Sequence, residues 1–192
     1  WRIAIVLHTL DSDWAKQLLA GMMGIFGDCG AAVIDVVECA FSPDFQVAEL
    51  DRLIALRPDA IISLPVANEQ VASAHRRVSE AGIKLVLLDN APTGLLPDKD
   101  YTALVSADNF GLGKIAAEGL SPHIPHSAEV GVLGFAADFF ATNEREIAFT
   151  RWLQVNRPDV TTHVRRFQKI EDVTETAADL FSNHPGLAGL FV

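Results

Sequence analysis

Short apolar runs alternate along the chain with longer amphipathic stretches. The apolar runs are rich in Val, Ile and Leu and lack a strict apolar-polar alternation, which is typical of parallel strands covered by helices on both faces. We predict strands near residues 3–8, 32–37, 59–64, 84–88, 102–106, 129–134, 160–166 and 187–192. We predict helices near residues 13–28, 45–57, 68–81, 109–120, 143–156 and 171–183. This rhythm indicates an α/β fold built from βαβ units.

Pro and Gly residues divide this rhythm into two halves. Arg57-Pro58-Asp59 and Arg157-Pro158-Asp159 each join a helical pattern to a strand, so both halves use the same connection. Residues 90–100 show no apolar period and are expected to form a surface excursion. We therefore predict an N-terminal α/β lobe, residues 1–106, and a C-terminal α/β lobe, residues 107–192. Because the sequence stops on an apolar strand, we expect the second lobe to be incomplete.

Composition excludes several classes of protein. With 49% hydrophobic and 21% charged residues, the chain is typical of an ordered globular protein. Its formal net charge of −10 argues against nucleic-acid binding through this chain, which needs a surplus of Lys and Arg. No apolar run approaches the roughly 20 residues of a membrane helix. Cys29 and Cys39 flank a predicted strand that holds them beyond the ~7 Å reach of a disulfide, so two free thiols are expected.

The loop after the first strand carries polar residues that end at an aromatic ring. His8, Ser12, Asp13 and Trp14 follow the apolar run directly. In open parallel sheets, ligands bind beyond the carboxyl ends of the strands. A flat ring with carboxylates nearby suits a sugar, which has both hydroxyl groups and weakly polar C–H faces. The simpler interpretation is that Ser12 or Asp13 caps the helix and that Trp14 packs against its own lobe.

Two further positions extend this candidate site. Asp89 and Asn90 follow the fourth strand at the same expected edge, although an Asp at a strand end is often a turn former. In the second half, Phe140 and Arg145 lie after the strand near 129–134. The guanidinium of Arg145 is a candidate ligand contact from the second lobe, with a surface ion pair as its simpler interpretation.

The junction between the halves carries its own signals. Ser106, Asp108 and Asn109 stand where a strand ends and a helix starts, and Asp108 is the expected N-cap. We assign these three residues to a cap and hinge.

No catalytic, cofactor or metal site is predicted. The loop after the first strand has no glycine, which disfavours dinucleotide binding, and the third strand does not end in the Asp of a phosphoacceptor domain. Residues 111–114 lack the spacing of a phosphate-binding loop and are better explained by close helix packing. His123 and His126 are separated by Pro125 without other ligands nearby, which disfavours zinc. No Gly-x-Ser-x-Gly motif is present.

Four segments together carry a family resemblance: residues 3–6, 81–90, 105–109 and 142–145. They resemble the sugar-binding family of periplasmic substrate-binding proteins of ABC transporters, of the ribose-binding type, over essentially the whole chain. The resemblance implies the type I periplasmic binding fold, with two Rossmann-like parallel-sheet lobes and a ligand cleft between them. It also implies a binding protein that is not an enzyme and that needs no cofactor.

The resemblance further implies roles for individual residues. Trp14 would stack on the sugar, Asp89 would bind its hydroxyl groups, and Arg145 would contact it from the second lobe. His8 and Ser12 would make secondary contacts. Further contacts are expected from loops beyond residue 192.

The chain departs from the ribose type at two positions. Ala15 stands where some sugar binders carry a second aromatic residue, and Asn90 stands where the ribose type has an arginine. The expected ligand is therefore another pentose, a hexose or a polyol.

The resemblance also implies partners and a location. A monomeric receptor would deliver its sugar or polyol to the membrane permease of an ABC transporter, in the periplasm or outside the cell. The alternative is the cytoplasmic effector-binding core of a lactose-repressor-type regulator, which has the same fold. The sensor domain of a membrane receptor is a third interpretation.

Overall fold

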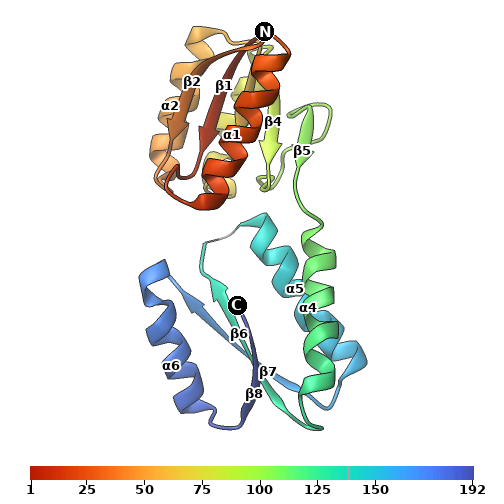
Figure 1. Ribbon diagram of the computed structural model, residues 1–192. Coiled ribbons are helices and arrows are strands. Elements are labelled where there is room, and N and C mark those ends of the chain that lie inside the picture. The colour runs from red at the N-terminus through yellow and green to blue at the C-terminus, as the bar shows by residue number, and fades with distance from the viewer. Residues whose placement is uncertain (138) are drawn as a thin grey trace. The chain divides into compact units, whose positions relative to one another are not determined.

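Two units, each built around its own parallel sheet, make up the chain: residues 1–107 and 108–192. They are seen in a computed structural model that describes residues 1–137 and 139–192. Within these residues the structure contains every predicted strand and helix, and the expected α/β class is confirmed (Figure 1).

The first unit is a five-stranded sheet with helices on both faces. Its strands stand in the order β2-β1-β3-β4-β5 and all pair in parallel. They are β1 (Arg2–Leu7), β2 (Ala32–Glu38), β3 (Ala60–Ser63), β4 (Lys84–Leu88) and β5 (Ala103–Val105). The helices are α1 (Asp13–Asp28), α2 (Pro43–Leu56) and α3 (Glu69–Glu80). Strand order reverses direction at β1, so the carboxyl ends of β1 and β3 form the expected position for a ligand.

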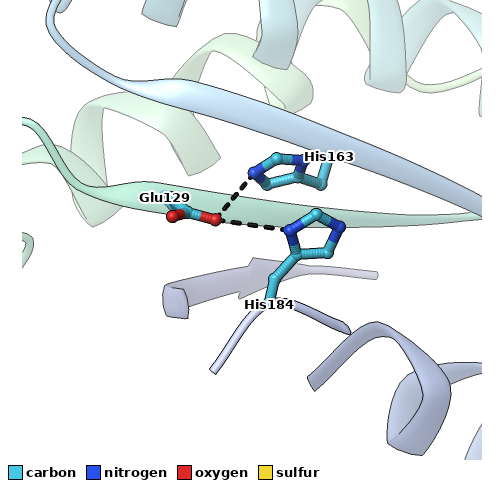
Figure 2. A group of neighbouring side chains, drawn as sticks. All are labelled: Glu129, His163 and His184. Carbon is cyan, nitrogen blue, oxygen red and sulfur yellow. Dashed lines mark ion pairs between the residues drawn. The ribbon is translucent and has the colours of Figure 1, made fainter. Parts of the chain in front are cut away.

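The second unit has a three-stranded parallel sheet in the order β7-β6-β8. Its strands are β6 (Glu129–Phe135), β7 (Thr161–Phe167) and β8 (Leu187–Phe191). Its helices are α4 (Asn109–Leu120), α5 (Phe140–Asn156) and α6 (Val173–Asn183), with short 3-10 helices at Ser121–His123 and Ile170–Asp172. Toward the amino ends of the strands, Glu129, His163 and His184 form a polar group (Figure 2).

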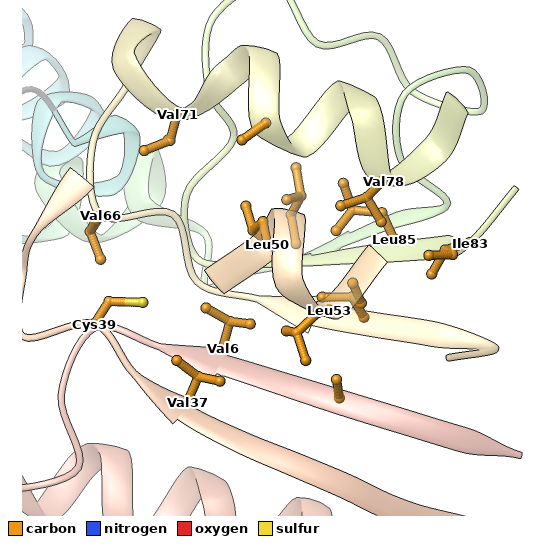
Figure 3. Packing of buried hydrophobic residues seen from close by; sticks show 14 of the residues in the cluster. Val6, Val37, Cys39, Leu50, Leu53, Val66, Val71, Val78, Ile83 and Leu85 are labelled. Atoms are coloured by element: carbon orange, nitrogen blue, oxygen red, sulfur yellow. The ribbon is translucent and has the colours of Figure 1, made fainter. Parts of the chain in front are cut away.

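Buried aliphatic side chains fix the two faces of the first sheet. Leu50 and Leu53 from α2 and Val78 from α3 pack on β1 and β4 at one face (Figure 3). Partly buried side chains of α1, including Leu18 and Met22, cover the opposite face. Each fully buried side chain of this kind stabilises the fold by about 1.5–3 kcal/mol. This core accounts for the near-continuous apolar character of the strands.

The two cysteines are free thiols, as predicted. Cys39 is completely buried in the core of Figure 3, and burial raises the pKa of its thiol to about 11. It therefore packs as a small apolar side chain. Cys29 is exposed after α1.

The excursion over residues 90–100 is anchored to the first unit by a few buried side chains. Leu95 and Asp100 are buried, and the carboxylate of Asp100 accepts a hydrogen bond from the backbone N–H of Leu96 at 2.9 Å. Ser79 of α3 donates to the backbone oxygen of Asp100. Most of the other residues in this segment are exposed, so the predicted surface excursion is confirmed, with buried anchors that the lack of an apolar period did not indicate.

Side chains cap three of the six α-helices in the described residues: α1, α2 and α4. Asp108 caps α4 as predicted, its carboxylate accepting from the backbone N–H of Gly111 at 2.8 Å. Helix α5 begins at Phe140, three residues before the predicted start, and its N-cap, Phe139, makes no side-chain cap. Within the described residues, no helix is both long enough and apolar enough to cross a membrane.

Candidate ligand-binding site

Three rings gather at the carboxyl edge of the first sheet, beyond β1. The ring centre of His8 lies 5.7 Å from that of Trp14 and 4.9 Å from that of Phe41, which meets it edge-on. Trp14 is 50% exposed, so part of its side chain remains accessible to a ligand. Phe41 was not predicted, although its position just after β2 places it at the same edge.

Asp89 lies beside this group of rings. It follows β4 in a left-handed backbone conformation, with φ of 58°, which Asp tolerates better than most residues. The hydroxyl of Ser106 donates to its carboxylate at 3.0 Å. This contact fixes the carboxylate and gives Ser106, predicted as part of a hinge, a defined partner.

The environment of His8 is unusual for an exposed edge. Burial lowers the pKa of His8, and the negative charges of Asp89 and Glu38 oppose that effect only in part. The imidazole is therefore neutral at pH 7 and offers one donor and one acceptor. Its Nδ1 atom is buried and has no hydrogen-bond partner within the described residues. A ligand hydroxyl group would satisfy it.

Two of the predicted contacts in the first loop have structural roles. Ser12 caps α1, its hydroxyl accepting from the backbone N–H of Ala15 at 3.1 Å, as the simpler interpretation held. Asp13 is exposed in the first turn, where a negative charge suits the helix dipole. The carboxylate of Glu38 accepts from both Thr9 and Leu10 and holds the loop in place.

Asn90 faces inward. It is buried, and its side-chain amide donates to the backbone oxygen of Pro65 at 3.2 Å. This bond ties the segment after β4 to the segment after β3. Asn90 thus supports the edge on which Asp89 stands.

In the second unit, Arg145 is held by a buried partner. Its Nε donates to the side-chain oxygen of Asn109 at 2.7 Å, and Asn109 is buried at the start of α4. The packing of α4 on α5 is close here, because a Cβ on Gly113 would lie within 2.8 Å of the carbonyl carbon of Arg145. This finding confirms close helix packing at Gly113, whereas a Cβ on Gly111 would meet the capping carboxylate of Asp108. Phe140 is exposed at the start of α5.

A hollow of about 370 Å³ opens at the carboxyl ends of β6 and β7. Its lining residues are Phe135, Ala136, Ala137, Asn143, Glu146, Ile147 and Arg166. Arg166 and Glu146 form an ion pair at 2.6 Å across it. This hollow was not predicted, because its lining residues come mainly from β6, β7 and α5 and form no local motif.

The structure thus brings His8, Trp14 and Asp89 together within the first unit. Within the second unit it pairs Arg145 with Asn109. Ser12 and Asn90 are occupied by backbone contacts of the edge itself.

Comparison with known proteins gives a consistent result. No curated protein matches the sequence. The solved structures that match the fold include three solute-binding proteins. One from Agrobacterium vitis with bound D-fucose has a TM-score of 0.88 at 19% identity, covering 99% of this chain and 66% of the other. A second structure from Agrobacterium vitis, with bound α-D-tagatopyranose, has a TM-score of 0.85 at 22% sequence identity. The match covers 99% of this chain and 66% of the other. A carbohydrate-transporter solute-binding protein from Agrobacterium radiobacter, with bound D-arabinose, has a TM-score of 0.84 at 19% sequence identity. The match covers 98% of this chain and 65% of the other.

The chain therefore spans just under two thirds of the length of these three structures. They confirm the type I periplasmic binding fold. Residues 3–192 match the periplasmic binding protein domain, which confirms the resemblance seen in the sequence. The chain belongs to the periplasmic binding protein family.

Proposed function

We propose that this protein is a solute-binding receptor for a sugar or related polyol. The observation that carries the proposal is the group of His8, Trp14 and Asp89 at one sheet edge, with a buried, unpartnered imidazole nitrogen. An exposed indole, a fixed carboxylate and a neutral imidazole match the C–H faces and hydroxyl groups of a sugar. The sugars in the three similar structures support the same ligand class.

Each group would have a separate task in binding. Trp14 stacks on the apolar face of the ring, and Asp89 accepts hydrogen bonds from hydroxyl groups. His8 donates or accepts through the nitrogen that lacks a partner. Asp13, exposed at the start of α1, contributes a contact at the rim.

The second unit would complete the site. Arg145, oriented by Asn109, donates to the ligand, and Phe140 supplies a second apolar surface. A hinge at the junction near Ser106 lets both units engage one ligand, so affinity depends on contacts from both.

The proposed context is transport. The three similar proteins are described as transporter solute-binding proteins or carbohydrate-transporter components, which supports delivery to an ABC permease. A monomer located in the periplasm or outside the cell fits that role. None of these comparisons supports the lactose-repressor alternative. The same three are binding proteins, which supports a role without catalysis.

A thermal-shift screen of the full-length protein tests the ligand class. Pentoses, hexoses, polyols and, as negative controls, amino acids would be added at millimolar concentration. A sugar at 100 times its Kd is expected to add about 2.7 kcal/mol to the free energy of unfolding and to raise the melting temperature. A rise with amino acids alone would contradict the proposal, and turnover of a hit would contradict a role without catalysis.

A further inference from the structure

A second polar group lies in the C-terminal unit, outside the candidate ligand site. It consists of Glu129 at the start of β6, His163 in β7 and His184 just after α6 (Figure 2). Oε2 of Glu129 lies 2.8 Å from Nε2 of His163 and 3.4 Å from Nδ1 of His184. The two imidazole rings are stacked, with centres 3.6 Å apart. One carboxylate oxygen thus faces two ring nitrogens from different elements.

Hydrogen bonding alone does not account for this arrangement. Although Nε2 of His163 is close to the carboxylate, the two are not aligned as a hydrogen bond, and this buried nitrogen has no hydrogen-bond partner within the described residues. A buried polar atom without a partner is costly and rare. A cation bound between the three side chains would satisfy the lone pair of the nitrogen.

The donor set and spacing fit one class of cation. Two imidazoles and a carboxylate are a ligand set of zinc sites, which leave a fourth position to water. Ligand atoms around a tetrahedral zinc ion are about 3.3 Å apart, from metal–ligand distances near 2.0–2.1 Å. All three ligand atoms here lie within 4.8 Å of one another. The side chains are partly exposed, at 21%, 22% and 41%, so an ion can enter from solvent.

We propose that Glu129, His163 and His184 bind a divalent zinc-type cation. The ion joins β6, β7 and the turn between α6 and β8, three segments that are distant in sequence. The group lies toward the amino ends of the strands, whereas the hollow of this unit opens at their carboxyl ends. The ion therefore lies at the opposite end of this sheet from the hollow.

Calorimetric titration of ZnCl2 into the chelator-treated full-length protein tests the site. We expect one Zn²⁺ per chain. His184→Phe and His163→Phe keep a flat ring for stacking but remove the donor nitrogen. Each phenylalanine variant is expected to bind zinc at least about 10- to 100-fold more weakly than the wild type. That range is the usual effect of removing a residue that only hydrogen-bonds to a metal ligand, and loss of a direct ligand should cost no less. His123→Ala, which changes an exposed histidine outside the group, is expected to bind zinc like the wild type.

Melting temperatures with and without Zn²⁺ separate a metal site from a purely structural contact. The wild type and His123→Ala are expected to melt at a higher temperature with zinc, and Glu129→Gln to lose that rise. The proposal is overturned if the wild type binds no zinc, or if its affinity is unchanged in both phenylalanine variants. It is also overturned if Glu129→Gln lowers the melting temperature equally with and without zinc.

Discussion

At the scale of single residues, the buried histidine of α3 has the clearest physical consequence. His75 is completely buried in the first unit. Its Nδ1 lies 2.8 Å from the backbone oxygen of Val71, an acceptor only, so Nδ1 carries the proton. Nε2 then accepts from the hydroxyl of Ser63 at 2.9 Å. Burial lowers the pKa of His75 from 6.5 to about 4, so the folded protein keeps it neutral.

This histidine should make stability depend on pH. Above pH 6.5 neither state binds the proton, but between pH 6.5 and 4 only the unfolded state does, so stability falls as pH falls. Between pH 7 and pH 5 the contribution of this group is about 2 kcal/mol. When the pH is lowered from 7 to 5, the free energy of unfolding of His75→Gln should therefore fall by about 2 kcal/mol less than that of the wild type. Urea unfolding at the two pH values measures this difference.

His123→Gln serves as the control, since His123 is exposed. Its free energy of unfolding should change between pH 7 and pH 5 by the same amount as that of the wild type. Equal losses in the wild type and in His75→Gln would show that His75 does not couple folding to pH.

Single residues were predicted well where their chemistry is local. Asp108 was identified from its place before a helix, and Cys29 and Cys39 from the length of the strand between them. The group of Glu129, His163 and His184 was missed because its members are distant in sequence. Only the register of β6 against β7 and β8 brings them together.

At the scale of elements, the repeated Arg-Pro-Asp connection has a shared function. Asp59 accepts a hydrogen bond from the backbone N–H of Arg2 at 2.7 Å. Asp159 accepts one from Ser127 at 2.9 Å and also binds Arg157 at 2.9 Å. These contacts lower the pKa of Asp159, with the bond from Arg157 contributing most. In both units the Asp fixes the backbone at or just before the start of a central strand, β1 or β6.

The packing of α4 on α5 depends on a missing side chain. Gly113→Ala would place a methyl group against the backbone of Arg145 and force the helices apart. We expect a loss of about 1–3 kcal/mol in the free energy of unfolding, as for other overpacked sites. Chemical denaturation of the purified variant measures it.

The matched control is Gly119→Ala in the same helix, where a new Cβ meets no atom within 4 Å. That change should leave stability equal or up to about 1 kcal/mol higher, because Ala favours helix more than Gly does. A Gly113→Ala variant as stable as Gly119→Ala would contradict the close approach of the helices.

Boundaries were predicted less well than the elements themselves. Helix α5 starts before Asn143 because the backbone N–H of Asn143 already bonds to the oxygen of Phe139. Neither Phe139 nor Phe140 carries a capping side chain, so the sequence gives no signal there.

At the scale of the whole molecule, the fold class followed from strands without apolar-polar alternation. Helices cover both faces of the first sheet, so its strands carry apolar residues on both sides. The order of the strands and the hollow of the second unit did not follow, because both depend on contacts between distant segments. The ring of Phe41 beside His8 was missed for the same reason.

The central claim is that Asp89, beside His8 and Trp14, holds a sugar. Asp89→Asn keeps the shape of the side chain and tolerates the left-handed backbone, but removes the charge. Losing the charge-assisted part of the hydrogen bonds should weaken binding by about 1.4 kcal/mol, or tenfold. Asp28→Asn, an exposed Asp at the end of α1, is the control.

Calorimetric titration of the full-length protein with the sugar identified by the thermal-shift screen measures this difference directly. The account predicts a Kd about tenfold higher for Asp89→Asn and unchanged for Asp28→Asn. Equal affinities in the wild type and Asp89→Asn would contradict it.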